Sequence, residues 1–428
     1  MRKKMRPRIF CPGGGLKAKI RNQYYELRIQ LYLAPALCYN AQVPAVMLFV
    51  LCRTAESRQI IQVHRGAAAG ERSYIMSHIA VLISGGDSPG MNTAVTAICR
   101  GADMLGMSLI GIDRGFNGLL GKNPETDFVQ MSMEHALDIA DQAGTHLRTA
   151  RCDEFRQKEV QARAAQLLRD RDIRGLIVIG GDGSFQGAKA LCEQGIPCIG
   201  IPGTIDNDLS YTSMTLGFDT AVNVCVEAVR AIRATSRSHD RPHVVEVMGR
   251  HCGDIALQTA MATGSEIVIC PEGGTWRVED IARRLQNHID RGNYRSTIVI
   301  AEGAWAKMEP FDIYGFLTPL GKQAYEGEPM TANRFANVLK RMCHMPDGSF
   351  AEVRSTVIGY TQRGARPSAR DAAFALEAGI WAVDLLNRGK GNRCIGRRNG
   401  VVFDQDINEA LREHRPFDVM MYNVINAL

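Results

Sequence analysis

From residue 79 onward, short runs of apolar residues alternate with segments in which apolar residues recur every three or four positions. The runs are typical of strands buried on both faces, and the three-to-four-residue period is typical of helices that bury one face. Strands are predicted at residues 79–84, 109–112, 176–179, 197–201, 244–248, 267–270, 297–301 and 356–360. Helices are predicted at residues 91–105, 160–169, 185–193, 222–233, 255–262 and 278–290.

This alternation predicts an α/β protein with mainly parallel sheets and helices on both faces of each sheet. The chain from residue 76 to the end has 353 residues (428 − 75), a length that suggests two domains. A stretch at about 305–329 has no clear pattern and several Gly and Pro residues, so we interpret it as a loop-rich insertion.

The first 75 residues differ from the rest in charge and pattern. They hold 13 Lys and Arg against 3 Asp and Glu, and residues 29–52 are uncharged. That run is long enough to span a bilayer, but Pro35 and Pro44 interrupt it, and neither an anchor nor a signal peptide is favoured. Met76 stands directly before the first predicted strand. We therefore expect residues 1–75 to be a disordered basic extension or translated upstream sequence.

The charge and the cysteines narrow the functional classes. The net charge is +6, of which the first 75 residues supply +10 (13 − 3), so the remainder carries −4 (38 − 42). An acidic body argues against nucleic acid as a partner. The 12 cysteines lack CxxC or zinc-site spacing, which favours reduced thiols in a cytoplasmic protein.

The stretch Pro202-Gly203-Thr204-Ile205-Asp206-Asn207-Asp208 follows a predicted strand directly. In an open parallel sheet, the carboxyl ends of the strands are where ligands bind. Asp206 and Asp208 stand two positions apart, so one can serve as a base while the other holds a metal. The alternative is a loop of Asx turns whose side chains only cap backbone amides.

Two glycine-rich loops also follow predicted strands. They are Ser84-Gly85-Gly86-Asp87-Ser88-Pro89-Gly90-Met91-Asn92 and Gly180-Gly181-Asp182-Gly183-Ser184. Glycines at such turns let a polyanion approach backbone amides at a helix N-terminus. Asp182 can reach a phosphate-bound magnesium ion, or it can simply cap the next helix. Together with the Pro202–Asp208 stretch, the loops predict a nucleoside triphosphate site.

These three motifs, with Met248-Gly249-Arg250 and Gln362-Arg363-Gly364, together resemble the 6-phosphofructokinases, and the bacterial ATP-dependent type most closely. The resemblance covers residues 76–428 and excludes residues 1–75. It implies two Rossmann-like three-layer domains with the active site in the cleft between them. It also implies a cytoplasmic glycolytic enzyme that uses magnesium (Mg2+) to transfer the γ-phosphoryl group of ATP to the 1-hydroxyl of fructose 6-phosphate. We expect a nucleotide-binding domain at residues 76–216 plus about 363–413, and a sugar-phosphate-binding domain at about 217–362 plus 414–428.

The resemblance assigns roles at matched positions. Asp206 is expected to be the base, with Thr204, Asp208, Arg151 and Gly86 as the other catalytic residues. The nucleotide-binding residues implied are Gly86, Phe116, Arg151, Cys152, Asp182, Gly183 and Ser184, with Asp182 also the magnesium ligand. The substrate-binding residues implied are Thr204, Asp206, Arg241, Met248, Gly249, Arg250, Glu302, Arg354, Tyr360 and Arg363. In the family, two of these arginines, here Arg241 and Arg354, reach a neighbouring subunit's site, so a homotetramer with shared sugar sites is implied.

Two glycines indicate the phosphoryl donor. Relatives that use diphosphate typically carry Asp at the position of Gly183 and Lys at that of Gly203, so ATP is favoured here. A kinase for a related sugar phosphate stays open. A non-catalytic regulatory subunit would be expected to lose the base or the magnesium carboxylate, whereas Asp206, Asp208 and Asp182 are all present.

The chain departs from the family pattern at several positions. Tyr360 stands where His is common, and the insertion at about 305–329 lies between sugar-site residues. In the family's effector pocket, only part of the pattern is kept. Arg100, Arg233 and Glu266 match it, whereas Thr96, Met133 and the region of Asn293 stand where basic residues are usual. We therefore predict blunted allosteric control.

Overall fold

The computed structural model of the chain describes residues 17–22, 25–30, 78–312, 329–414 and 416–427. The chain divides into two compact units, Met1–Glu71 and Arg72–Leu428. In the first unit, β1 (Lys17–Asn22) pairs antiparallel with β2 (Tyr25–Gln30). Most of the uncharged run predicted at 29–52 lies outside the described residues. None of the helices in the described ranges is long and apolar enough to cross a membrane.

The larger unit contains a sheet of seven strands in the order β13-β12-β7-β6-β3-β4-β5. These strands are β3 (His78–Ser84), β4 (Ser108–Ile112), β5 (Phe128–Met131), β6 (Ile173–Gly180), β7 (Cys198–Pro202), β12 (Arg393–Arg398) and β13 (Val401–Asp406). All neighbours are parallel except the two edge strands, β5 and β13. The next strand in the sequence, β4, lies on one side of β3, and β6 lies on its other side. The topological switch point of the sheet is therefore at the carboxyl end of β3.

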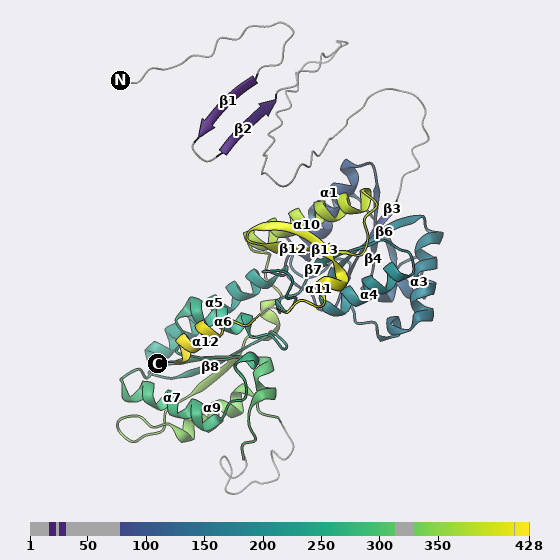
Figure 1. Cartoon of the computed structure of the whole chain (residues 1–428). Helices are drawn as coiled ribbons and strands as arrows, with labels where there is room; N and C mark the ends of the chain where they lie inside the picture. The colour runs from purple at the N-terminus through teal and green to yellow at the C-terminus, as the bar shows by residue number, and fades with distance from the viewer. Residues whose placement is uncertain (1–16, 23–24, 31–77, 313–328, 415, 428) are drawn as a thin grey trace, which may run out of the picture. The chain divides into compact units, whose positions relative to one another are not determined.

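Helices cover both faces of this sheet (Figure 1). One face packs on α1 (Met91–Met104) and α10 (Ala369–Asn387), and the other on α3 (Lys158–Asp170) and α4 (Asp182–Glu193). Alternate residues of β3 belong to the two cores, as the period of a strand requires: Val81 packs on the first side and Leu82 on the second. The central strands are therefore apolar on both faces.

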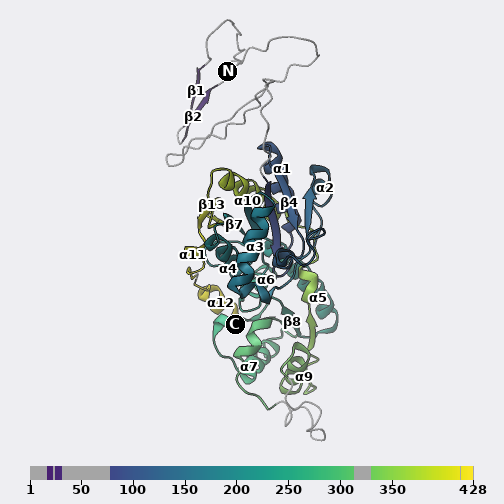
Figure 2. The same cartoon turned by 90° about the vertical axis from the view of Figure 1, so that its right-hand side faces the viewer.

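A second sheet has four parallel strands in the order β11-β8-β10-β9. These are β8 (His243–Val247), β9 (Ile267–Ile269), β10 (Thr297–Ala301) and β11 (Arg354–Val357). One face packs on α5 (Phe218–His239), α6 (Asp254–Thr263) and α12 (Val419–Asn426), and the other on α7 (Val278–Asp290) and α9 (Ala332–Met342). In both views the carboxyl-terminal α12 lies beside α6 of this half (Figure 2).

Short elements complete the larger unit. They are η1 (Gly115–Leu120), α2 (Met133–Asp138), η2 (Asp153–Arg156), η3 (Pro271–Gly273), η4 (Glu302–Lys307), η5 (Gly359–Gln362) and α11 (Ile407–Ala410).

The α/β class with mainly parallel sheets is confirmed, but some boundaries are corrected. The strand predicted at residues 356–360 is wrong in its bounds: β11 ends at Val357, and residues 359–362 form η5. Gly359 has a φ of 57°, a left-handed conformation that ends the strand. Several strands and helices were not predicted, namely β1, β2, β5, β12, β13, α2, α9, α10, α11 and α12. Of the predicted insertion, residues 313–328 lie outside the described residues.

Candidate active site

Three loops meet at the carboxyl ends of the adjacent strands β3, β6 and β7. The Ser184 hydroxyl donates a hydrogen bond to the Ser84 carbonyl at 3.0 Å, which joins the loop after β6 to the end of β3. The Gly203 amide donates to the Gly180 carbonyl at 3.0 Å, which continues the ladder between β7 and β6. Parallel pairing thus brings together three motifs that lie up to 120 positions apart in the sequence, as Gly86 and Asp206 do (206 − 86).

The loops open into a cavity of about 920 Å³. Its walls come from both sheets: Asp206 follows β7 of the larger sheet, and Arg250 and Glu302 follow β8 and β10 of the smaller one. Fifteen residues expected from the sequence line it, namely Gly86, Phe116, Arg151, Cys152, Asp182, Gly183, Ser184, Thr204, Asp206, Asp208, Met248, Arg250, Glu302, Tyr360 and Arg363. Three others, Gly249, Arg241 and Arg354, do not line it.

Asp206 is the carboxylate best suited to accept a proton. Its side chain is 8% exposed, and its Oδ1 atom has no hydrogen-bond partner among the described residues. Burial, with the nearby Asp208 charge, raises its pKa from 3.8 to about 6, against the opposing effect of Arg363. A base whose pKa lies close to neutral combines ionisation at pH 7 with useful proton affinity.

Asp208 and Asp182 lie on the same cavity wall. Asp208 is exposed at the cavity surface, but the protein around it removes part of its hydration and raises its pKa, and the Asp182 carboxylate adds to the rise. Asp182 is the first residue of α4 and is exposed. The two carboxylates therefore feel each other's charge across the cavity, an arrangement that a cation relieves.

One end of the cavity is shaped by an aromatic pair. Phe116 packs on Phe155 with ring centroids 4.4 Å apart, and a Cβ atom on Gly187 would lie 2.5 Å from the Phe116 ring. Gly187 and Phe155 were missed in the sequence, since neither belongs to a motif. A Cβ atom on Gly183, by contrast, would meet nothing within 4 Å. The cavity thus keeps open space at Gly183.

Gly203, the second of the two donor-related glycines, has a crowded environment. A Cβ atom there would lie 2.8 Å from Met91 Cε and 2.9 Å from Ile179 Cγ2. Real Cβ atoms do not approach so closely, so any side chain at this position would displace the packing between α1 and β6.

Arg250 and Arg363 also line the cavity. Arg250 has a left-handed φ of 54°, and its backbone amide donates to Glu302 Oε1 at 2.7 Å. Gly249 acts through conformation: its φ is 141°, and a Cβ atom would lie 2.3 Å from the Cys252 carbonyl oxygen. Arg363 crosses from η5 to the larger sheet, where its Nη1 donates to the Asp87 carbonyl at 2.7 Å. Two guanidinium groups thus face the carboxylate cluster.

Arg241 and Arg354 lie together outside the cavity. Arg241 Nε is 2.5 Å from Glu352 Oε2, and Arg354 Nη2 is 3.5 Å from the same oxygen. Glu352 was missed in the sequence. Within one chain these two arginines therefore form a separate, partly exposed cluster.

Asn207, between the two acids, connects the halves. Its φ is 55°, its Nδ2 donates to Asp254 Oδ2 at 2.8 Å, and its Oδ1 accepts from the Thr215 amide at 3.0 Å. Asp254 is the first residue of α6 in the smaller-sheet half. Asn207 thus caps a backbone amide eight residues on, which is not an Asx turn, whereas Asp206 keeps an unpartnered oxygen in the cavity.

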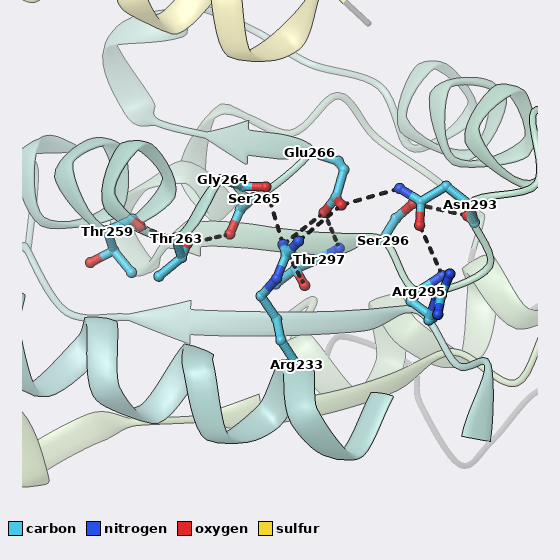
Figure 3. Close-up of polar contacts among 10 residues, drawn as sticks. All are labelled: Arg233, Thr259, Thr263, Gly264, Ser265, Glu266, Asn293, Arg295, Ser296 and Thr297. Atoms are coloured by element: carbon cyan, nitrogen blue, oxygen red, sulfur yellow. Dashed lines mark hydrogen bonds and ion pairs between the residues drawn. The ribbon is translucent and has the colours of Figure 1, made fainter. Parts of the chain in front are cut away.

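A smaller pocket of about 240 Å³ lies at the amino end of the second sheet and is lined by Arg233, Arg237, Glu266, Asn293 and Arg295. Figure 3 shows the Arg233 guanidinium paired with the Glu266 carboxylate, at 3.0 and 3.2 Å. Arg233 also donates to the Gly264 carbonyl and the Thr297 hydroxyl. Its hydrogen-bonding capacity is therefore used largely within the chain.

Other residues of the expected effector pattern do not line this pocket in one chain: Arg100, Thr96 and Met133 are absent from its wall. The Thr96 hydroxyl is buried and donates to the Ala136 carbonyl at 2.6 Å.

Comparisons with known proteins agree with this geometry. A family model described as phosphofructokinase matches residues 78–386. The chain is 43% identical over 353 residues to a protein of Alkaliphilus metalliredigens named ATP-dependent 6-phosphofructokinase, covering 82% of this chain and 99% of that protein. A Bacillus mycoides protein of the same name is 41% identical over the same coverage.

Solved structures give the same fold. The phosphofructokinase of Saccharomyces cerevisiae superposes with a TM-score of 0.65 and 29% identity, covering 82% of this chain and 46% of that chain. A pyrophosphate-dependent phosphofructokinase of Marinobacter aquaeolei has a TM-score of 0.64 but 22% identity, covering 81% of this chain and 86% of that chain. The second likeness supports the fold alone.

Proposed function

The chain belongs to the phosphofructokinase family, and on that premise we propose that it transfers the γ-phosphoryl group of ATP to the 1-hydroxyl of fructose 6-phosphate. The products are fructose 1,6-bisphosphate and ADP, and the reaction is the committing phosphorylation of glycolysis. The observation that carries the proposal is Asp206: a buried carboxylate with an unpartnered oxygen and a pKa of about 6, facing a cavity that two glycine-rich loops border.

In the proposed reaction, the Asp206 carboxylate takes the proton of the 1-hydroxyl as its oxygen attacks the γ-phosphorus. The bond from that phosphorus to the bridging oxygen of ADP breaks, and ADP leaves. Arg151 and the backbone at Gly86 stabilise charge on the transferring group, while Thr204 and Asp208 orient the reactants. Phosphoryl transfer depends mainly on such positioning and charge stabilisation.

We assign the nucleotide to the end of the cavity with Phe116, Cys152, Gly183 and Ser184. The sugar phosphate is assigned to the other end, where Arg250 and Arg363 pair with phosphate oxygens. Glu302, Met248 and Tyr360 complete the sugar site, with Gly249 shaping the loop. We accordingly keep the nucleotide-binding domain at residues 76–216 plus about 363–413, and the sugar-phosphate-binding domain at about 217–362 plus 414–428.

Magnesium is the cofactor proposed, held by Asp182 with help from Asp208. Among the described residues, no group of three or more possible ligands is found, so an all-protein cage is not what these residues offer. Two carboxylates on one cavity wall fit an ion that takes one or two carboxylates and completes its shell with phosphate and water oxygens. Such an ion supplies charge neutralisation on the phosphates.

Assembly and location follow from the family as proposals. We propose a cytoplasmic homotetramer in which Arg241 and Arg354 of one subunit complete the sugar site of another. Their position outside the cavity of their own chain supports this assignment. Neither nucleic acid nor a membrane is a proposed partner.

The acceptor is tested by comparing sugar phosphates on the full chain with ATP and magnesium. We expect kcat/KM to be highest for fructose 6-phosphate, with the bisphosphate identified as product. A higher value for tagatose 6-phosphate or sedoheptulose 7-phosphate would redirect the assignment to a related sugar-phosphate kinase. Absence of turnover on all three, with sugar phosphate still bound, would favour a non-catalytic regulatory subunit.

Allosteric control is expected to be blunted. Arg233 is paired with Glu266, and Asn293 adds no charge to the pocket, so the contacts with phosphate groups are left mainly to Arg237 and Arg295. We expect ADP or phosphoenolpyruvate at millimolar concentration to change the half-saturating fructose 6-phosphate concentration by less than about threefold, which is under 1 kcal/mol of coupling. A steep change in sigmoidicity with either effector would contradict this prediction.

A further inference from the structure

We propose that Trp305 and Glu246 are positioning residues for the sugar-site carboxylate Glu302, an inference that rests on the proposed function. Neither side chain lines the cavity. Their effect is exerted through η4, the short helix that begins at Glu302 and contains Trp305.

Glu246 is joined to η4 by a specific hydrogen bond. The indole Nε1 of Trp305 donates to Glu246 Oε2 at 2.9 Å, from η4 to the penultimate residue of strand β8. Glu246 is only partly exposed, and burial raises its pKa, while hydrogen bonds from Trp305 and from the Ala332 backbone lower it. The carboxylate is thus held between the strand that leads to Arg250 and the start of α9.

The geometry of a 3₁₀ helix makes this hydrogen bond consequential for Glu302. Such a helix has three residues per turn, so side chains three apart lie over one another. Glu302 and Trp305 are three apart in η4. The bond from Trp305 to Glu246 therefore fixes the rotation of η4 about its axis, and that rotation sets where the Glu302 carboxylate points.

Packing holds the indole in this orientation. The ring centroid of Trp305 lies 5.8 Å from that of Trp276 and 5.6 Å from that of Phe335. Trp276 is itself tied to η4, since its Nε1 donates to the Ala304 carbonyl at 2.8 Å. The aromatic cluster and Glu246 together leave η4 little freedom to turn.

Motion of η4 would be passed directly to the sugar site. A Cβ atom on Gly303 would lie 2.0 Å from the Arg250 carbonyl oxygen, so η4 packs against the backbone of the Arg250 loop. Glu302 Oε1 also accepts the Arg250 amide at 2.7 Å. A turn of η4 would therefore displace Glu302 and Arg250 together, while the Asp206 loop belongs to the other sheet.

The test is the substitution Trp305→Phe, which keeps an aromatic ring and removes the indole donor. We expect KM for fructose 6-phosphate to rise by about five- to tenfold, with kcat and KM for ATP within about twofold of wild type, because binding at one end of the cavity alone is weakened. Glu246→Leu, which removes the acceptor of the indole N–H at a similar side-chain size, should move KM for the sugar in the same direction. Steady-state kinetics on the full chain give all three constants.

The matched control is Trp381→Phe. Trp381 Nε1 donates to Asp404 Oδ1 at 3.1 Å, the same kind of indole–carboxylate hydrogen bond, but in the larger-sheet half and away from the cavity. We expect its thermal stability to fall with its KM values unchanged. The inference is overturned if a folded Trp305→Phe protein keeps the wild-type KM for fructose 6-phosphate, or if Trp381→Phe raises it equally.

Failure of the proposed function can be distinguished from failure of the positioning role. It would show as a wild-type chain that does not turn over fructose 6-phosphate. The positioning role is then measured by the Kd for fructose 6-phosphate from isothermal titration calorimetry. That Kd should rise about five- to tenfold in Trp305→Phe relative to wild type, and an unchanged value would overturn the inference.

Discussion

Asp206→Asn is expected to lower turnover by about two or more orders of magnitude, the scale of general base catalysis, with fructose 6-phosphate still bound. The substitution keeps the shape of the side chain and removes the proton acceptor. The measurement is kcat in a coupled assay, with sugar binding followed separately by thermal shift. Wild-type activity should also fall as the pH drops through about 6, where Asp206 becomes protonated.

The same substitution should stabilise the fold above neutral pH. The pKa of Asp206 is raised from 3.8 to about 6 in the folded chain, so ionisation is less favourable there than in the unfolded chain. Stability from this group is full below its unfolded pKa and is lost as pH rises through about 6. At pH 8, Asp206→Asn should therefore gain about 2 to 3 kcal/mol of unfolding free energy, and the gain should vanish near pH 4.

A control variant tests whether the loss of turnover is specific to Asp206 or follows the removal of any carboxylate. Asp384 lies on α10 and pairs with Arg388 at 2.8 Å, away from the cavity. Asp384→Asn should leave turnover unchanged and should not stabilise the chain at pH 8. If Asp206→Asn kept near-wild-type turnover, another residue would be the base.

Gly183→Asp is expected to reduce kcat/KM for ATP by about a hundredfold or more, since like charges placed together at a binding site cost several kcal/mol. A Cβ atom at Gly183 meets nothing within 4 Å, so the new carboxylate can be accommodated without disturbing the fold. Its charge then faces the α-phosphate of the nucleotide. Kinetics with ATP as the varied substrate measure the effect.

The matched variant is Gly183→Asn, which adds the same bulk without the charge and should cost much less. The single change should not create a diphosphate-dependent enzyme, because such relatives typically also carry Lys at the position of Gly203. In this chain, the space that a Cβ atom would need there is filled by Met91 and Ile179. Equal losses in Gly183→Asp and Gly183→Asn would show that space rather than charge selects the donor. An unchanged kcat/KM for ATP in Gly183→Asp would place the α-phosphate elsewhere.

The parts of the site that depend on short sequence motifs could be predicted from the sequence. An apolar run followed by glycines and an acid marks the end of a buried strand, and the parallel sheet then brings Asp182, Asp206 and Gly86 to one cavity. The α/β class followed from the same alternation. These inferences need only neighbouring residues and the rule that adjacent parallel strands end at the same edge.

Features set by contacts distant in sequence were not predictable. Helix α5 begins at Phe218, where the Gly217 and Thr220 amides donate to the buried carboxylate of Asp371 at 2.9 and 2.8 Å. The bond from Asn207 to Asp254 and that from Trp305 to Glu246 likewise join residues 47 and 59 positions apart. Hydrophobic periodicity carries no signal for such polar pairs.

Helix α10 was missed for a related reason. A Cβ atom on Gly379 would lie 2.5 Å from the Ala97 Cβ, so α10 and α1 pack too closely for large side chains. Its contact face is therefore built from small residues such as Ala375 and Ala378. Small residues give a weak hydrophobic period, and the pattern did not predict the helix.

The most direct test of the account is a coupled assay of the full chain with fructose 6-phosphate and magnesium, run in parallel with ATP and with diphosphate as donor. The account predicts turnover with ATP and at most background with diphosphate. Turnover with diphosphate in place of ATP, or with neither donor, would contradict the proposed activity.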